Sequence, residues 1–233
     1  MNKFGMKLLG MAIAAGINMF SAGSAMATME TFQITNGNVG DGSNLANASI
    51  TFNTSANQVQ ITLNNTSNTH AAGELLYGVT FTISGVTSAP SIAGLSGQQE
   101  TGDSSSYSYG SVSSNSSLSS PWTTSINTGV YSLTGSSADD LVISAPQASG
   151  NPYPSANPSV FNHTPWLATG ATFTLGVSGV SASSTISDAT FEFGSSGSSA
   201  QLPASQMPTP EPATLGLMTV GGIALLMKKR KKA

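Results

Sequence analysis

Residues able to carry out acid–base or nucleophilic chemistry are few and far apart in this chain. It has two histidines, His70 in a polar turn and His163 in the segment Asn162-His-Thr-Pro-Trp166, and it has no cysteine. A hydrolase triad would need a histidine base and a nucleophile motif such as G-x-S-x-G, and the sequence offers no such motif to pair with either histidine. We therefore interpret both histidines as loop residues. A secreted hydrolase is the least favoured function class, and the sequence predicts a protein that is not an enzyme.

The neighbouring carboxylates Asp139 and Asp140 could pair as acid and base or help to bind calcium. Adjacent residues on a strand point to opposite faces of a sheet, and the segment lacks the spaced oxygen ligands of a calcium loop. We expect a solvated turn there. By the same alternation, Glu192 between Phe191 and Phe193 is expected to face water. The sequence predicts no metal site and no cofactor.

Two tryptophans, Trp122 and Trp166, each follow a proline in irregular sequence. Exposed, the two rings could stack on sugar rings, which would fit a carbohydrate-binding or ice-binding module. If they are buried, each ring would cover an end of the fold and bury about 150–250 Å² of its own surface. We expect burial and keep a glycan contact at these two residues as the alternative.

Charge divides the chain into three parts. All seven Lys and Arg residues lie at the two ends of the chain, and residues 28–209 contain none. Nine of the ten Asp and Glu residues lie within residues 28–209, and the tenth is Glu211. A body with this acidic balance repels phosphate backbones, which excludes nucleic acid as a partner. Its solubility must come from hydroxyls, amides and scattered negative charges.

Strict alternation of apolar and polar residues predicts an all-β fold. The alternating runs are residues 50–52, 58–64, 78–84, 171–177 and 188–193. Short strands with polar, glycine-containing connections favour an antiparallel β-sandwich, jelly-roll-like or Ig-like, of about eight to ten strands. A parallel β-solenoid is the competitor, but no period of about 20 residues is visible.

Three segments of the body predict irregular structure. Residues 94–120 are rich in serine, residues 145–165 contain five prolines, and residues 194–209 consist mainly of Ser, Gly, Ala and Pro. We expect insertions in the first, a long loop in the second and a flexible linker in the third. The ectodomain is then predicted to span residues 28–193.

The amino-terminal segment, residues 1–27, has the features of a signal peptide. Lys3 and Lys7 precede an apolar stretch, and the small residues Ala25 and Ala27 form a signal-peptidase site. We expect Sec-dependent export and cleavage after Ala27, against the alternative of a retained amino-terminal anchor.

The carboxy-terminal segment, residues 210–233, has three parts in order. Pro210, Glu211 and Pro212 are followed by an apolar stretch, residues 213–227, and then by the basic residues Lys228, Lys229, Arg230, Lys231 and Lys232. A helix over the apolar stretch would be roughly 22 Å long against a hydrocarbon core of about 30 Å, a gap that long basic side chains and local thinning can cover. The positive tail would remain in the cytoplasm and act as the membrane stop.

This order of parts resembles the PEP-CTERM sorting signal of exopolysaccharide-producing Gram-negative bacteria. The resemblance covers about the last 25 residues, a length like that of one short spanning segment with flanks. It implies that exosortase, a membrane-embedded protease, recognises Pro210, Glu211 and Pro212 and releases the protein from a transient membrane anchor. The alternative is a permanently attached single-pass protein.

The body is similar to uncharacterised β-rich PEP-CTERM proteins. The matching residues are Asn64-Asn65-Thr66-Ser67, the strand from Gly78 to Ser84, and a final hairpin from Gly170 to Phe193. This resemblance supports the fold and implies no activity.

The leading hypothesis is an exported structural or interaction protein of the cell surface, extracellular matrix or biofilm. Exopolysaccharide is its expected partner besides Sec and exosortase. A carbohydrate-binding or ice-binding module is the alternative.

Overall fold

The computed structural model describes residues 28–40, 45–147, 152–154, 156–195 and 200–208. The signal segment with Ala25 and Ala27, and the carboxy-terminal segment with Pro210, Glu211, Pro212 and the basic residues 228–232, lie outside these ranges. Within the described ranges, no helix combines the length and the apolar character needed to cross a membrane.

The described chain is nearly all β, as the alternation predicts. Its strands are β1 (Met29–Asn38), β2 (Leu45–Ser55), β3 (Gln58–Asn65), β4 (Leu76–Ile83), β5 (Ser91–Gly102), β6 (Tyr107–Val112), β7 (Thr123–Asn127), β8 (Val130–Thr134), β9 (Val142–Ile143), β10 (Trp166–Gly176), β11 (Ile186–Phe193), β12 (Ala200–Pro203) and β13 (Ser205–Gln206). Three single-turn helices interrupt them: η1 (Ala72–Glu74), η2 (Asn115–Ser117) and α1 (Pro158–Phe161).

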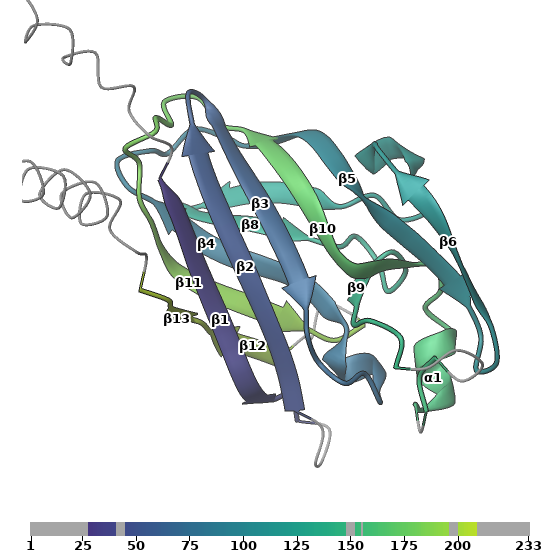
Figure 1. Cartoon of the computed structure of the whole chain (residues 1–233). Coiled ribbons are helices and arrows are strands. Elements are labelled where there is room, and N and C mark those ends of the chain that lie inside the picture. Colours follow the sequence, from purple (N-terminus) through teal and green to yellow (C-terminus); the bar gives the residue numbers. More distant parts are fainter. Residues whose placement is uncertain (1–27, 41–44, 148–151, 155, 196–199, 209–233) are drawn as a thin grey trace, which may run out of the picture.

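The strands form two layers that face each other (Figure 1). The front layer has the order β13-β1-β2-β3-β10-β5-β6, and the back layer has the order β12-β11-β4-β8-β7. Strand β9 pairs with β4 and with β10, and the consecutive strands β12 and β13 belong to different layers. The two layers are therefore one continuous hydrogen-bonded sheet rather than two separate sheets, antiparallel except at the β9–β10 pair.

The core lies between the two layers. It is formed by the apolar residues of the alternating runs, whose side chains point inward. Every apolar residue of the five alternating runs is buried: Ile50, Phe52, Val59, Ile61, Leu63, Val79, Phe81, Ile83, Ala171, Phe173, Leu175, Val177, Ala189, Phe191 and Phe193. A chain of aromatic contacts crosses from front to back, with centroid separations of 5.8 Å for Phe32–Phe52, 4.8 Å for Phe52–Phe81 and 5.6 Å for Phe81–Tyr131.

The serine-rich segment 94–120 is more regular than its composition suggests, and the prediction of an irregular insertion is wrong there. It contains most of β5 and all of β6, which pair in register from Gly97–Val112 to Gly102–Tyr107. Asp103 Oδ1 closes the hairpin by accepting from the backbone N–H groups of Ser105 (2.7 Å) and Ser106 (2.9 Å). Pairing of β5 with β10 holds the hairpin on the body although few of its side chains are apolar.

Residues 194–209, predicted as a flexible linker, also contain strands. Strand β12 pairs with β11 and β13 pairs with β1, Leu202 packs against the core, and the Met207 N–H donates to the Thr31 carbonyl at 2.8 Å. The folded body therefore extends past residue 193 to the last described residues.

The proline-rich segment 145–165, predicted as a long loop, contributes side chains to a second, smaller core. Helix α1 starts at the cap residue Asn157, whose side chain accepts from the Ser159 N–H. The small cluster, which we call the satellite core, contains Leu75, Leu141, Ile143, Tyr153, Val160 and Trp166, all buried.

Candidate functional site

The backbones of the two histidines belong to hydrogen-bonded turns. The His70 backbone N–H donates to Glu74 Oε2 at 2.5 Å, and its carbonyl accepts from the Asn157 N–H at 2.6 Å. His163 follows α1, and its N–H donates to the Val160 carbonyl. Both side chains are half-buried. Among the described residues, no three His, Asp or Glu side chains lie close enough together to hold a metal ion.

Asp140 does not lie in a solvated turn, and the sequence-based expectation for it is wrong. Its side chain is completely buried, with Oδ1 accepting from Gln99 Nε2 at 2.6 Å and Oδ2 accepting from the Ser120 N–H at 2.8 Å. Its carbonyl accepts from Trp122 Nε1 at 2.9 Å. The neighbouring Asp139 is half-buried, and its N–H donates to Ser137 Oγ at 3.2 Å. Asp140 instead connects the loop before β9 to β5 and to the segment before β7.

Both tryptophans are buried, which removes the tentative glycan contact and confirms the burial that we expected. Trp122 is 2% exposed and packs on Phe173 with centroids 4.8 Å apart. Trp166 is 0% exposed and lies edge-to-face against Tyr153 in the satellite core. Neither ring offers an exposed face to a sugar.

Buried carboxylates are a feature that the sequence analysis missed. Glu30, Glu74, Glu100 and Asp140 are all buried. Glu30 Oε2 accepts from the Ile186 N–H at 2.6 Å, and Glu74 Oε2 accepts from the N–H groups of His70 and Ala71. As predicted, Glu192 lies on the face opposite Phe191 and Phe193, although it is half-buried rather than fully exposed.

Glu100 is the one of these acids with a fully buried oxygen that has no hydrogen-bond partner. It lies on β5 in register with Trp166 on one side and Tyr109 on the other. Its Oε1 accepts from the Tyr153 hydroxyl at 2.9 Å, whereas its Oε2 and the Trp166 Nε1 are buried without a partner. Burial raises the pKa of Glu100, and the hydrogen bond from Tyr153 opposes the rise. Burial and the Glu100 charge raise the pKa of Tyr109 to about 12.

We predict that Glu100→Gln stabilises the protein at neutral pH. The folded protein binds the Glu100 proton more tightly than the unfolded chain, whose pKa is near 4.5. Stability from this group is therefore fully present below that value and is lost as the pH rises through the raised folded pKa. The melting temperature of Glu100→Gln should exceed that of the wild type at about pH 8, and the difference should disappear below about pH 4.

Asp103→Asn is the matched control, and its melting temperature is expected to change in the opposite direction. Hydrogen bonds, chiefly from the Ser105 backbone N–H, hold the pKa of Asp103 below 3.8. This variant should melt below the wild type at neutral pH and approach it in acid. A Glu100→Gln protein that melts at or below the wild-type temperature at every pH would refute the account given for Glu100.

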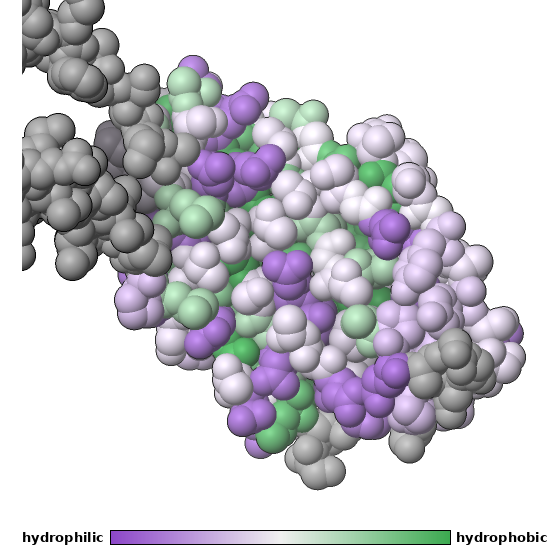
Figure 2. Space-filling model, viewed as in Figure 1, coloured by the Kyte–Doolittle hydropathy of each residue, from purple (hydrophilic) through white to green (hydrophobic). Residues whose placement is uncertain are grey.

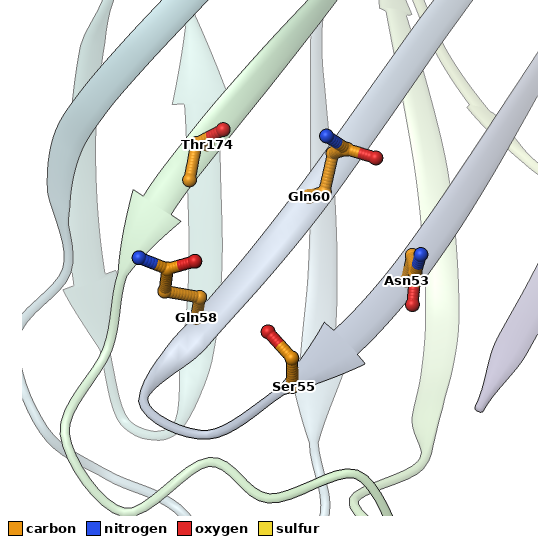
Figure 3. Close-up of a pocket in the computed structure, with 5 residues that line it drawn as sticks. All are labelled: Asn53, Ser55, Gln58, Gln60 and Thr174. Atoms are coloured by element: carbon orange, nitrogen blue, oxygen red, sulfur yellow. The ribbon is translucent and has the colours of Figure 1, made fainter. Parts of the chain in front are cut away.

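A shallow hollow of about 180 Å³ lies on the outer side of the front layer (Figure 3). Five residues line it: Asn53 and Ser55 at the end of β2, Gln58 and Gln60 at the start of β3, and Thr174 near the end of β10. We call it the amide groove. The sheet register explains its layout, since Asn53, Gln60 and Thr174 are in one cross-strand row and Ser55 and Gln58 are in the next.

Glycine and a tight turn shape this groove. Gly176 stands in register with Gln58 and adds no side chain to the second row. The β2–β3 turn is fixed by Asn57, which has a positive φ of 58°, and whose Oδ1 accepts from the Gly179 N–H at 3.0 Å. Asn53 Oδ1 is a buried atom with no hydrogen-bond partner. The groove thus contains an acceptor that the protein itself leaves unused.

The face around the amide groove carries no exposed acidic or basic side chain. The five strands β1, β2, β3, β10 and β5 contain two acids, and both are buried: Glu30 on the side of the main core, and Glu100 against Tyr153 and Trp166 of the satellite core. A row of hydroxyls crosses these strands in register: Thr31, Thr51, Thr62, Thr172 and Ser96. Figure 2 shows this face as mainly neutral to hydrophilic, with small scattered apolar spots.

Comparison with known proteins identifies a motif in the carboxy-terminal segment. The PEP-CTERM protein-sorting motif matches residues 208–231. The chain therefore carries a PEP-CTERM sorting motif, which targets a protein for export, for transient membrane anchoring and for exosortase. No curated protein and no solved structure gives a significant match.

Proposed function

We propose that this protein is exported through the inner membrane of a Gram-negative bacterium, released by exosortase, and retained outside the cell in a structural or interaction role. The observation that carries the proposal is the sorting motif at residues 208–231. The composition of the body is compatible with this proposal. Hydroxyls, amides and negative charges can keep a surface without Lys or Arg in solution, with no need for a cytoplasmic partner.

We further propose that the protein acts without catalysis. Three of its four buried acids support this reading, because they hold the fold: Glu30 accepts from a backbone N–H of β11, Glu74 caps a turn, and Asp140 joins three segments. The proposed role is cohesion of an extracellular polysaccharide matrix or biofilm. Loss of the protein should then weaken cell aggregation, while the purified chain hydrolyses none of the polysaccharides of that matrix.

The processing step is tested by replacing Pro210, Glu211 and Pro212 together with alanine. Wild-type protein should appear in the surface or extracellular fraction with an intact mass that lacks the carboxy-terminal tail. The triple variant should remain in the membrane fraction with the tail attached, because exosortase would no longer recognise it. Fractionation followed by intact-mass spectrometry measures both properties.

Gln201→Ala, at an exposed position of β12 close to the motif in sequence, is the control and should be processed like the wild type. Full-length wild-type protein in the cytosol, with both ends uncut, would rule out the proposed function. Equal release of the wild type and the triple variant would rule out the role of the motif.

A further inference from the structure

The amide groove combines a depression, a set of neutral hydrogen-bonding groups and an acceptor without a partner. We propose that it is a binding site for a neutral, hydroxyl-rich polysaccharide chain. This inference rests on the proposed function only in so far as the protein must reach the compartment where such a polymer occurs. It assigns the partner to a site that contains neither of the two tryptophans.

The lining chemistry selects hydroxyl groups. Each Asn or Gln side chain presents one acceptor and two donors on a short fixed frame, and each hydroxyl can donate and accept. Three amides and two hydroxyls therefore offer both functions side by side, which is what a sugar hydroxyl requires. Asn53 Oδ1 is covered and has no partner in the protein, so it accepts one such hydroxyl once the Asn53 amide rotates toward the groove, and that contact removes the cost of leaving the atom unsatisfied.

Charge excludes the main competing ligands. Residues 28–208 contain no Lys or Arg, so an acidic polysaccharide or a phosphate-bearing headgroup would meet no cation there. The groove lining contains no carboxylate either, which leaves a cationic ligand without a counter-charge. A protein partner would need apolar anchors. A polymer bearing hydroxyls and no charge is the class that these residues match.

The dimensions favour a polymer over a single small molecule. The hollow of about 180 Å³ is smaller than the roughly 300–1,000 Å³ of pockets that enclose whole ligands. The neighbouring hydroxyl row continues the same chemistry across five strands spaced about 4.8 Å apart. One residue of the polymer can occupy the groove while the following ones lie across the row.

The expected affinity per site is low. Hydrogen bonds exchanged with water give modest net free energy, and no aromatic ring is available in the groove to add stacking. We expect a dissociation constant of about 1 mM for an oligosaccharide. Several copies of the domain held on one surface would bind one polymer with higher avidity without any new contact.

The test uses the full-length chain, labelled with ¹⁵N and held in zwitterionic micelles whose headgroups carry no sugar. Cellohexaose and maltohexaose are the neutral probes, and an oligomannuronate is the acidic one. We expect saturable shifts of the Asn53, Gln60 and Thr174 amide signals with at least one neutral probe and none with the acidic probe. The double variant Asn53→Ala/Gln60→Ala should bind at least tenfold more weakly, whereas Gln201→Ala, the same residue type on the back layer, should bind like the wild type.

Four results would overturn the inference: no saturable shift with either neutral probe, equal binding of the acidic probe, undiminished binding by the double variant, or shifts that follow protein rather than sugar concentration. The last would identify the face as a contact between two copies of the chain. An unchanged circular dichroism spectrum of the double variant establishes that it is folded. If the protein binds no sugar, the cell-fractionation result still supports export and processing. If processing fails, the titration can still show sugar binding, so the two proposals are tested independently.

Discussion

Replacing Asp140 by alanine is expected to reduce the free energy of unfolding by about 2–4 kcal/mol, because two partly buried donors lose their acceptor. These donors are Gln99 Nε2 and the Ser120 N–H, at 2.6 Å and 2.8 Å from the carboxylate. Alanine is also disfavoured at the positive φ of 58° that Asp140 adopts. Chemical denaturation followed by tryptophan fluorescence measures the change, since Trp122 donates to the Asp140 carbonyl.

Asp139→Ala is the matched control for this prediction. The side chain is half-buried, and the expected loss is about 0.5 kcal/mol or less, as for most substitutions away from buried networks. Similar losses for the two variants would mean that the carboxylate of Asp140 is not the feature that fixes this loop.

The second large effect is expected for Phe81→Ala. Phe81 is completely buried on β4 and contacts Phe52 of the front layer and Tyr131 of the back layer. Truncation leaves a cavity where the two layers meet, and substitutions of this kind cost about 3–5 kcal/mol. Thermal and urea unfolding should both show the loss. Removal of one ring should reduce stability without changing the strand content of the far-ultraviolet spectrum.

Val130→Ala on the neighbouring strand β8 serves as the comparison. Val130 is in register with Thr82, one position from Phe81, but it is 41% exposed, so its truncation should cost about 0.5 kcal/mol. A Phe81→Ala protein as stable as Val130→Ala would show that the aromatic chain does not hold the layers together.

The sequence predicts the elements whose side chains alternate strictly. The runs at residues 58–64, 78–84 and 171–177 become β3, β4 and β10 because their apolar side must be covered on folding, and a period of two places that side on one face of a sheet. The same rule places Phe191 and Phe193 in the core and Glu192 on the opposite face. The carboxy-terminal sorting motif was predicted from the order of its three parts, and the family match at residues 208–231 confirms it.

Other features depend on contacts that no local pattern encodes. Strand β6 has one buried residue, Val112, and forms because β5 supplies a hydrogen-bonding edge. Asp140 is buried because Gln99 and Ser120, distant in sequence, provide donors for it. The amide groove was missed for the same reason, since it exists only when the end of β2, the start of β3 and the end of β10 are placed in register.

The pairing of β1 with β13 has a consequence for how the protein is presented. The two strands are antiparallel neighbours, so the chain enters the body at Thr28 and leaves it after Met207 at the same corner (Figure 1). An anchor attached at this corner would leave both broad faces of the domain uncovered. If exosortase then removes the anchor, the same surfaces would meet the surrounding medium before and after the cut, so the cut would change how far the domain travels rather than which side it displays.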